Sequence, residues 1–418
     1  MSRPAFLVTE TRSWLAVFVW TIILFLTIPL ARSLQEVIRG FFGKTSFGYL
    51  VIAVVIAVTA FIIYRLKGHI SFRSSNLWWL LVCAGVLIAY TIRLWDNPVE
   101  AVHFIQYGVL AALLFMAFAW RHKNFLIYPA VILATVIVGT IDEGIQWLIP
   151  KRVWGLSDIG INSLAAIIVC VAIAMCIRPK GFQQGINRFS IRLVLNLGIV
   201  CTLIMTLCLA NTPNAIKWYG ERIPALNYLA EDGHIMAEYG FLYKDEEIGI
   251  FRSRYSVDDL PKVDKQRALD AAEKLDAAPK LEDYGDFIRK YSPITDPFLH
   301  ELRVHLNRRD YYLKTGQQQE RYSSEERQRR LVIAWYENRI VEKYFPESLA
   351  QSSFTLSAQE REVARLGDTL SGQYESPVSI ALITIASKRI LLAALIILLV
   401  GLVIVRIIIM SGSRDAQV

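Results

Sequence analysis

Nine polar residues in the middle of a strongly apolar sequence have side chains that could bind a ligand or transfer protons. They are four carboxylic acids, two amides, an imidazole, a guanidinium and a phenol: Glu100, His103, Tyr107, Asp142, Glu143, Gln146, Arg152, Asp158 and Asn162. Ionisable residues inside membrane spans are costly and usually mark a functional site. Whether these nine residues lie in membrane spans depends on the apolar sequence around them.

The apolar residues of the chain lie in eight long runs, each with roughly the ~20 residues that cross a bilayer. The chain has 418 residues, of which 54% are hydrophobic, and a formal net charge of +8. The runs are 14–31, 48–64, 77–92, 101–120, 125–149, 159–177, 193–210 and 390–410. This pattern predicts an all-α integral membrane protein with about eight transmembrane helices and a mostly helical extracytoplasmic domain inserted before the last helix.

The chain is predicted to divide into five segments. They are an N-terminal anchor and loop (1–47), a helical membrane domain (48–178), a seventh span (179–210), a soluble domain (211–378) and a last span with a short tail (379–418). The first apolar run is longer than the ~7–15 residues of a signal-peptide core, so we interpret it as an uncleaved anchor. All five cysteines fall within apolar runs, which indicates packing residues rather than disulfides or a metal site.

The orientation follows from the lysines and arginines of the short loops, which favour the cytoplasmic side. They are more frequent on the side of the N-terminus, which predicts an inside N-terminus, an outside soluble domain and an inside C-terminus. The localisation predicted is the bacterial cytoplasmic (inner) membrane. The basic excess is explained by these loops, and nothing in the sequence indicates nucleic-acid binding.

The nine polar residues are expected to converge near the outer leaflet. Glu100, His103 and Tyr107 are spaced i, i+3 and i+7 and would share a helical face. Either Asp142 or Glu143 would share a helical face with Gln146. Asp158 and Asn162 would share a face of the following helix, for which Ser157 is a candidate N-cap. Helices joined by short loops are neighbours. We expect an outward-opening pocket, with Arg152 folded over Glu143 or Asp158; the alternative is a buried network that only locks three helices together.

The same residues carry a resemblance to a known family. The pattern Glu100-x-x-His103-x-x-x-Tyr107, followed by Glu143-x-x-Gln146, Pro150, Arg152, Asp158 and Asn162, resembles the VanZ-like membrane proteins over roughly residues 50–178. One departure is visible, because the family often has glycine shortly after its asparagine and this chain has Ser163-Leu164-Ala165. The resemblance implies the bacterial cell envelope and a link to glycopeptide resistance, but no particular reaction.

The segment 211–378 is predicted to be mostly helical. Asp296 before Pro297 is a helix start, and Ser323-x-x-Glu326 and Ser357-x-x-Glu360 have the form of capping boxes. The stretch "EEIGIFRSRYS" has β character and predicts a strand or short hairpin. His300 and His305 resemble a zinc-protease motif, but five residues put them about 140° apart on a helix, so no metal is expected there.

Three functions fit these residues. The preferred one is an envelope accessory protein that binds the polar head of a membrane lipid or lipid-linked precursor and contacts a periplasmic or surface protein through residues 211–378. The alternative is a membrane-embedded enzyme that acts on lipid head groups. Glu100 and His103, beside Asp142 or Glu143, would then bind a divalent metal or form a carboxylate–imidazole acid/base pair. A transporter fits least, because the opposite halves of these spans are apolar. Catalytic residues and cofactors stay unassigned.

Overall fold

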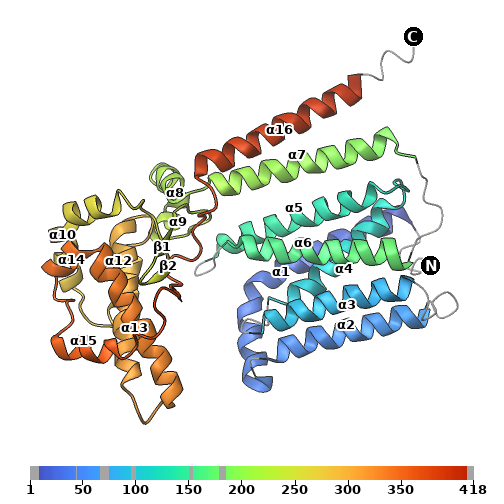
Figure 1. Ribbon diagram of the computed structural model, residues 1–418. Coiled ribbons are helices and arrows are strands. Elements are labelled where there is room, and N and C mark those ends of the chain that lie inside the picture. Colours follow the sequence, from blue (N-terminus) through green and yellow to red (C-terminus); the bar gives the residue numbers. More distant parts are fainter. Residues whose placement is uncertain are drawn as a thin grey trace. The chain divides into compact units, whose positions relative to one another are not determined.

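The computed structural model describes residues 9–43, 45–65, 75–95, 100–149, 154–177 and 185–411. The chain divides into two compact units. The span unit comprises Met1–Cys208 and Ala394–Val418, and the polar unit comprises Leu209–Ala393. Helix α16 begins in the polar unit and ends in the span unit (Figure 1).

The span unit consists of helices. They are α1 (Glu10–Phe42), α2 (Ser46–Arg65), α3 (Ser75–Arg93), α4 (Val102–Phe118), α5 (Ile127–Trp147), α6 (Leu156–Val171) with a π-helical continuation (Ala172–Ile177), α7 (Arg188–Ala210) and α16 (Lys388–Ser411). Among the described residues, seven helices are long and apolar enough to cross a membrane, so this is a multi-pass membrane protein. The remaining predicted span corresponds to α4, whose 17 residues fall short of that length.

Helix α1 is longer than the apolar run that predicted it. The run was expected to end at residue 31, but the helix continues to Phe42. The extension has the sequence RSLQEVIRGFF, in which Leu, Gln, Glu and Arg have high intrinsic helix propensity. The part of α1 that qualifies as a membrane span is Glu10–Ile28.

Helices α4, α5 and α6 form the centre of the span unit. Each packs against the other two, and α4 also packs against α1. Small and branched residues fill the centre, including Leu110, Ala111, Ile127 and Ala166, none of which has exposed surface. Figure 1 shows these helices running alongside one another. The polar residues of α4–α6 are therefore held by the best-packed part of the unit.

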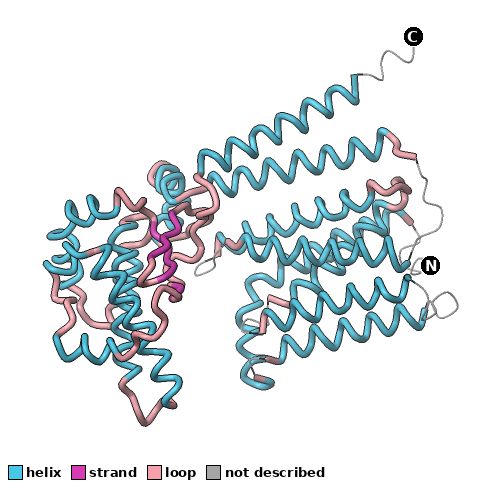
Figure 2. The backbone as a smooth tube through the Cα atoms, in the orientation of Figure 1, coloured by secondary structure: helices cyan, strands magenta, loops and turns pink. Residues whose placement is uncertain are grey.

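The polar unit is helical with one small sheet, which Figure 2 shows in magenta. The helices are α8 (Pro213–Gly220), a 3-10 turn (Pro224–Leu226), α9 (Asn227–Glu231), α10 (Leu260–Asp276), α11 (Tyr284–Lys290), α12 (Pro297–Gly316), α13 (Ser324–Tyr344), α14 (Pro346–Gln351) and α15 (Ala358–Arg365). The predicted hairpin is confirmed: β1 (Phe241–Asp245) pairs antiparallel with β2 (Gly249–Ser253), from Phe241 opposite Ser253 to Asp245 opposite Gly249. The short β3 (Tyr374–Glu375) pairs parallel with β2.

The predicted helix starts of the polar unit are confirmed. The Asp296 side chain accepts a hydrogen bond from the Leu299 amide, and Pro297 opens α12. Both capping boxes form, at Ser323 and at Ser357. Phe298, Leu302 and Leu306 of α12 are fully buried in the same core as residues of α13. Each such side chain contributes about 1.5–3 kcal/mol by leaving water.

Candidate functional site

The polar residues of the span unit gather at one end of α4, α5 and α6. Tyr107 lies in the second turn of α4, Asp142, Glu143 and Gln146 in the last two turns of α5, and Asn162 in the second turn of α6. These five residues, named here the α4–α6 cluster, are all buried, and Glu143 and Asn162 have no exposed surface. The predicted convergence of the three helices is present.

Hydrogen bonds within the cluster centre on the amide of Gln146. Its Nε2 donates to Asp142 Oδ2 at 3.1 Å and to Glu143 Oε1 at 2.9 Å, one helical turn away in each case. The second oxygen of Glu143 accepts from the backbone N–H of Gly155 at 3.2 Å. Gly155 is the N-cap of α6, so the Glu143 carboxylate lies at the positive end of that helix dipole, where a negative charge is stabilised.

A close approach of the three helices occurs at Gly139. A Cβ atom at this position would lie 3.0 Å from Asn162 Nδ2, 3.3 Å from Asn162 Cβ and 3.5 Å from Tyr107 Cε1. Only glycine lets α5 come this near to α4 and α6 without displacing a side chain. One sequence signal could have identified this position: Gly139 precedes Asp142 by three residues and therefore lies one helical turn from it on the same side of the helix.

Several buried polar atoms of this region have no hydrogen-bond partner among the described residues. They are both side-chain polar atoms of Asn162 and the indole N–H of Trp154 just before α6. The Tyr107 hydroxyl interacts with the Asp142 carboxyl, and the carboxyls of Glu143 and Asp158 also lie within electrostatic range of it. Unsatisfied buried polar groups cost about 1–3 kcal/mol each, so a cluster of them in a native fold requires an explanation.

His103 and Asp158 flank the cluster. The His103 ring is stacked on the Tyr107 ring, with centroids 5.9 Å apart and planes 16° from parallel. Asp158 lies in the first turn of α6, where its charge also favours the helix dipole. Among the described residues, no group of three or more His, Cys, Asp or Glu side chains is arranged to hold a metal ion.

Glu100 lies in the turn before α4, which begins at Val102, and its carbonyl accepts from the His103 amide at 3.2 Å. The expectation about Ser157 was wrong. Ser157 does not cap α6, because the cap is Gly155 and Ser157 is already helical. Arg152 and the residues beside it, 150–153, lie outside the described part of the chain.

The polar unit has buried carboxylates of its own, among them Glu337 on α13. Its oxygens accept from Arg308 Nε at 2.9 Å, Tyr374 Oη at 2.8 Å and Ser376 Oγ at 2.9 Å, and lie 2.6 Å from His305 Nδ1. Burial alone raises the pKa of Glu337, but its interactions with His305 and Arg308 bring this pKa below its ordinary value. His305 on α12 therefore makes a contact inside the fold, with the Glu337 carboxylate.

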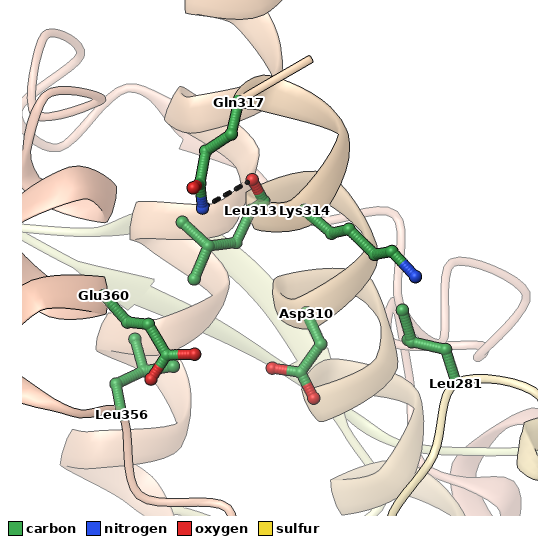
Figure 3. A pocket seen from close by; sticks show the side chains of 7 residues that line it. All are labelled: Leu281, Asp310, Leu313, Lys314, Gln317, Leu356 and Glu360. Atoms are coloured by element: carbon green, nitrogen blue, oxygen red, sulfur yellow. Dashed lines mark hydrogen bonds between the residues drawn. The ribbon is translucent and has the colours of Figure 1, made fainter.

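A pocket of about 350 Å³ opens on the polar unit (Figure 3). Its acidic residues point toward one another from α12 and α15 in Figure 3. Asp310 Oδ1 accepts from Arg309 Nε at 2.7 Å, and Glu360 belongs to the capping box of α15. Because both acids already serve the fold, we assign no ligand to this pocket. It is lined by Leu281, Asp310, Leu313, Lys314, Gln317, Leu356 and Glu360.

No family model, curated protein or solved structure matches this chain. The resemblance to the VanZ-like proteins therefore rests on the sequence pattern between Glu100 and Asn162. Evidence for a function therefore comes from the α4–α6 cluster itself.

Proposed function

We propose that this protein is a VanZ-like accessory protein of the bacterial envelope whose α4–α6 cluster binds the polar head of a membrane lipid or lipid-linked precursor. In this proposal the N-terminus is inside, residues 211–378 are outside, and α4 crosses the membrane as an eighth span. The cluster then lies near the outer leaflet. A periplasmic or surface protein would contact the polar unit.

The observation that carries the proposal is that both polar atoms of the Asn162 side chain, beside Tyr107, have no hydrogen-bond partner among the described residues. Each side chain is at most 1% exposed, and the two meet at Gly139. A bound head group could supply the missing hydrogen-bond partners at the end of the bundle, where the polar part of a lipid resides. A network that served only to lock the helices together would be expected to satisfy its own members.

The charges of the cluster narrow the ligand class. Asp142 and Glu143 are acceptors when ionised, and Asp158 lies nearby. A head group rich in hydrogen-bond donors, such as an amine or the hydroxyls of a sugar or glycerol, fits these acceptors. The anionic phosphate of the same lipid would need a cation, and the sequence supplies Arg152 in the adjoining loop.

Lipid binding to the purified protein tests this proposal. Phosphatidylethanolamine, phosphatidylglycerol and a polyprenyl-linked sugar would be titrated and bound lipid counted by native mass spectrometry. Tyr107→Phe and Asn162→Ala should each weaken binding of the preferred lipid about tenfold or more, since a lost hydrogen bond of about 1.4 kcal/mol is a factor of ten. Tyr128→Phe, at the other end of α5, is the matched control. Equal affinity in all four proteins would disprove the proposal.

A further inference from the structure

The polar unit is joined to two membrane spans without a flexible linker. Helix α7 ends at Ala210 and α8 begins at Pro213. At the other end, α16 begins at Lys388, and its Nζ donates to Thr212 Oγ1 at 3.0 Å. The two connections are therefore tied to each other beside the end of α7 and the start of α16.

Further hydrogen bonds tie these connections to the sheet region of the polar unit. The Tyr239 hydroxyl donates to the Leu209 carbonyl at 2.9 Å, and the Ala237 amide donates to the Asn211 carbonyl at 3.2 Å. Tyr239 also forms a parallel bridge with Ile383, five residues before α16. Residues 209–212, 237–239 and 383–388 are thus tied to one another beside the chain connections to α7 and α16.

The same region of the polar unit carries large apolar side chains exposed to solvent. Trp218 on α8 is 59% exposed, Ile223 is 46% exposed and Ile385, three residues before α16, is 97% exposed. The opposite face of α8 is used for packing, since Ile216 and Gly220 are buried. Trp218 therefore lies on the face of α8 that is not packed against the polar unit.

Basic groups accompany these apolar side chains. The Arg222 guanidinium lies over the Trp218 ring, 4.8 Å from its centroid. Lys217 is exposed on α8, and Lys388 and Arg389 open α16. Tryptophan is enriched at the head-group level of bilayers, and Arg and Lys side chains beside it reach lipid phosphates with their charged ends.

We propose that Trp218, Arg222, Ile223 and Ile385 form a membrane-contacting rim that inserts into the lipid head-group layer around the ends of α7 and α16. The rim holds the polar unit down on the bilayer that its own spans cross. Its apolar side chains enter the boundary between head groups and acyl chains, and its basic groups pair with lipid phosphates. This inference does not depend on the ligand of the α4–α6 cluster or on which side of the membrane the polar unit occupies.

Photo-crosslinking in native membranes tests the rim with the full-length protein. Trp218→p-benzoylphenylalanine and Ile385→p-benzoylphenylalanine would be compared with the same change at Leu366, which is 63% exposed beside α15. In Figure 1, α15 lies at the opposite end of the polar unit from α8. After irradiation, mass spectrometry would detect phospholipid adducts.

The two rim positions should give lipid adducts at least about fivefold more often than position 366, because only they lie at the head-group layer. Adducts to a second copy of this chain or to another protein, in place of lipid, would overturn the rim. Equal lipid yields at all three positions would overturn it as well. Because each change replaces an exposed side chain, folding is not at risk, and a melting temperature equal to wild type confirms this for each variant.

Discussion

Two glutamates in this protein have no exposed surface, and their surroundings differ. Glu337 in the polar unit accepts hydrogen bonds from Arg308, Tyr374 and Ser376 and contacts His305. Glu143 in the span unit accepts from the neutral amides of Gln146 and Gly155. Glu337 is hydrogen-bonded by side chains from several elements, whereas Glu143 belongs to the same cluster as Asn162, whose side-chain polar atoms have no partner among the described residues.

The difference distinguishes a structural charge from a candidate site. A buried carboxylate with cationic and hydroxyl partners from several elements contributes to a unique fold, and removing it strands those partners. A buried carboxylate next to polar atoms without partners differs, because a ligand can form hydrogen bonds with those atoms. The predictions below test whether the two glutamates really belong to these two classes.

The largest effect is expected for Glu337→Gln. The change leaves the Arg308 charge without its buried partner, and breaking such pairs costs about 3–5 kcal/mol. Thermal unfolding of the full-length protein in detergent would measure the loss. Glu325→Gln on the same helix is the matched control, because its partner Arg329 is 76% exposed and surface pairs contribute about 0–1 kcal/mol. Equal melting temperatures for the two variants would contradict the structural role of Glu337.

A smaller effect is expected if Glu143 is paired with Arg152. Arg152→Ala should then destabilise the protein more than Arg152→Ala combined with Glu143→Gln, with a coupling of about 2 kcal/mol. Thermal stability of the single and double variants measures the coupling. If the losses of the Arg152→Ala and Glu143→Gln variants simply add in the double variant, Arg152 and Glu143 are not partners. Asp158→Asn would then replace Glu143→Gln in the same cycle.

Gly139→Ala should crowd the α4–α6 cluster and cost about 1–3 kcal/mol, because the new Cβ would meet Asn162 at 3.0 Å. Lipid binding should weaken in parallel. Gly144→Ala on the same helix is the control, since a Cβ at Gly144 would meet nothing within 4 Å. Similar unfolding temperatures and lipid affinities for the two variants would show that the helices do not meet closely at Gly139.

The smallest effect concerns acid sensitivity of the polar unit. Burial, with a contribution from Arg254, lowers the pKa of His300 to about 3, below the ordinary 6.5. The unfolded chain therefore binds a proton between pH 6.5 and 3 that the folded chain does not, and stability falls as the pH falls through this window. His300→Gln should reduce the loss between pH 7 and pH 6 by about 0.7 kcal/mol. An unchanged pH dependence of thermal unfolding would refute this.

The sequence by itself determined the features that depend on near neighbours. Apolar runs of span length predicted the membrane helices, and residues spaced three or four apart predicted the Asp296 cap, both capping boxes and the shared face of Glu143 and Gln146. These features follow from helix geometry within one or two turns. The same local reasoning misplaced the cap at Ser157, because the exact first residue of a helix also depends on the loop before it.

Only the tertiary structure decided which groups from distant segments meet. The contact of Gly139 with Tyr107 and Asn162, the Gly155 amide on Glu143, and the arrival of Tyr374 and Ser376 at Glu337 each join separate elements. Such contacts depend on how whole helices pack, since the distance between two elements is set by every side chain along their interface. A residue's type and spacing show what it can bind, and the packing determines whether its partner comes from the protein or is left for a ligand.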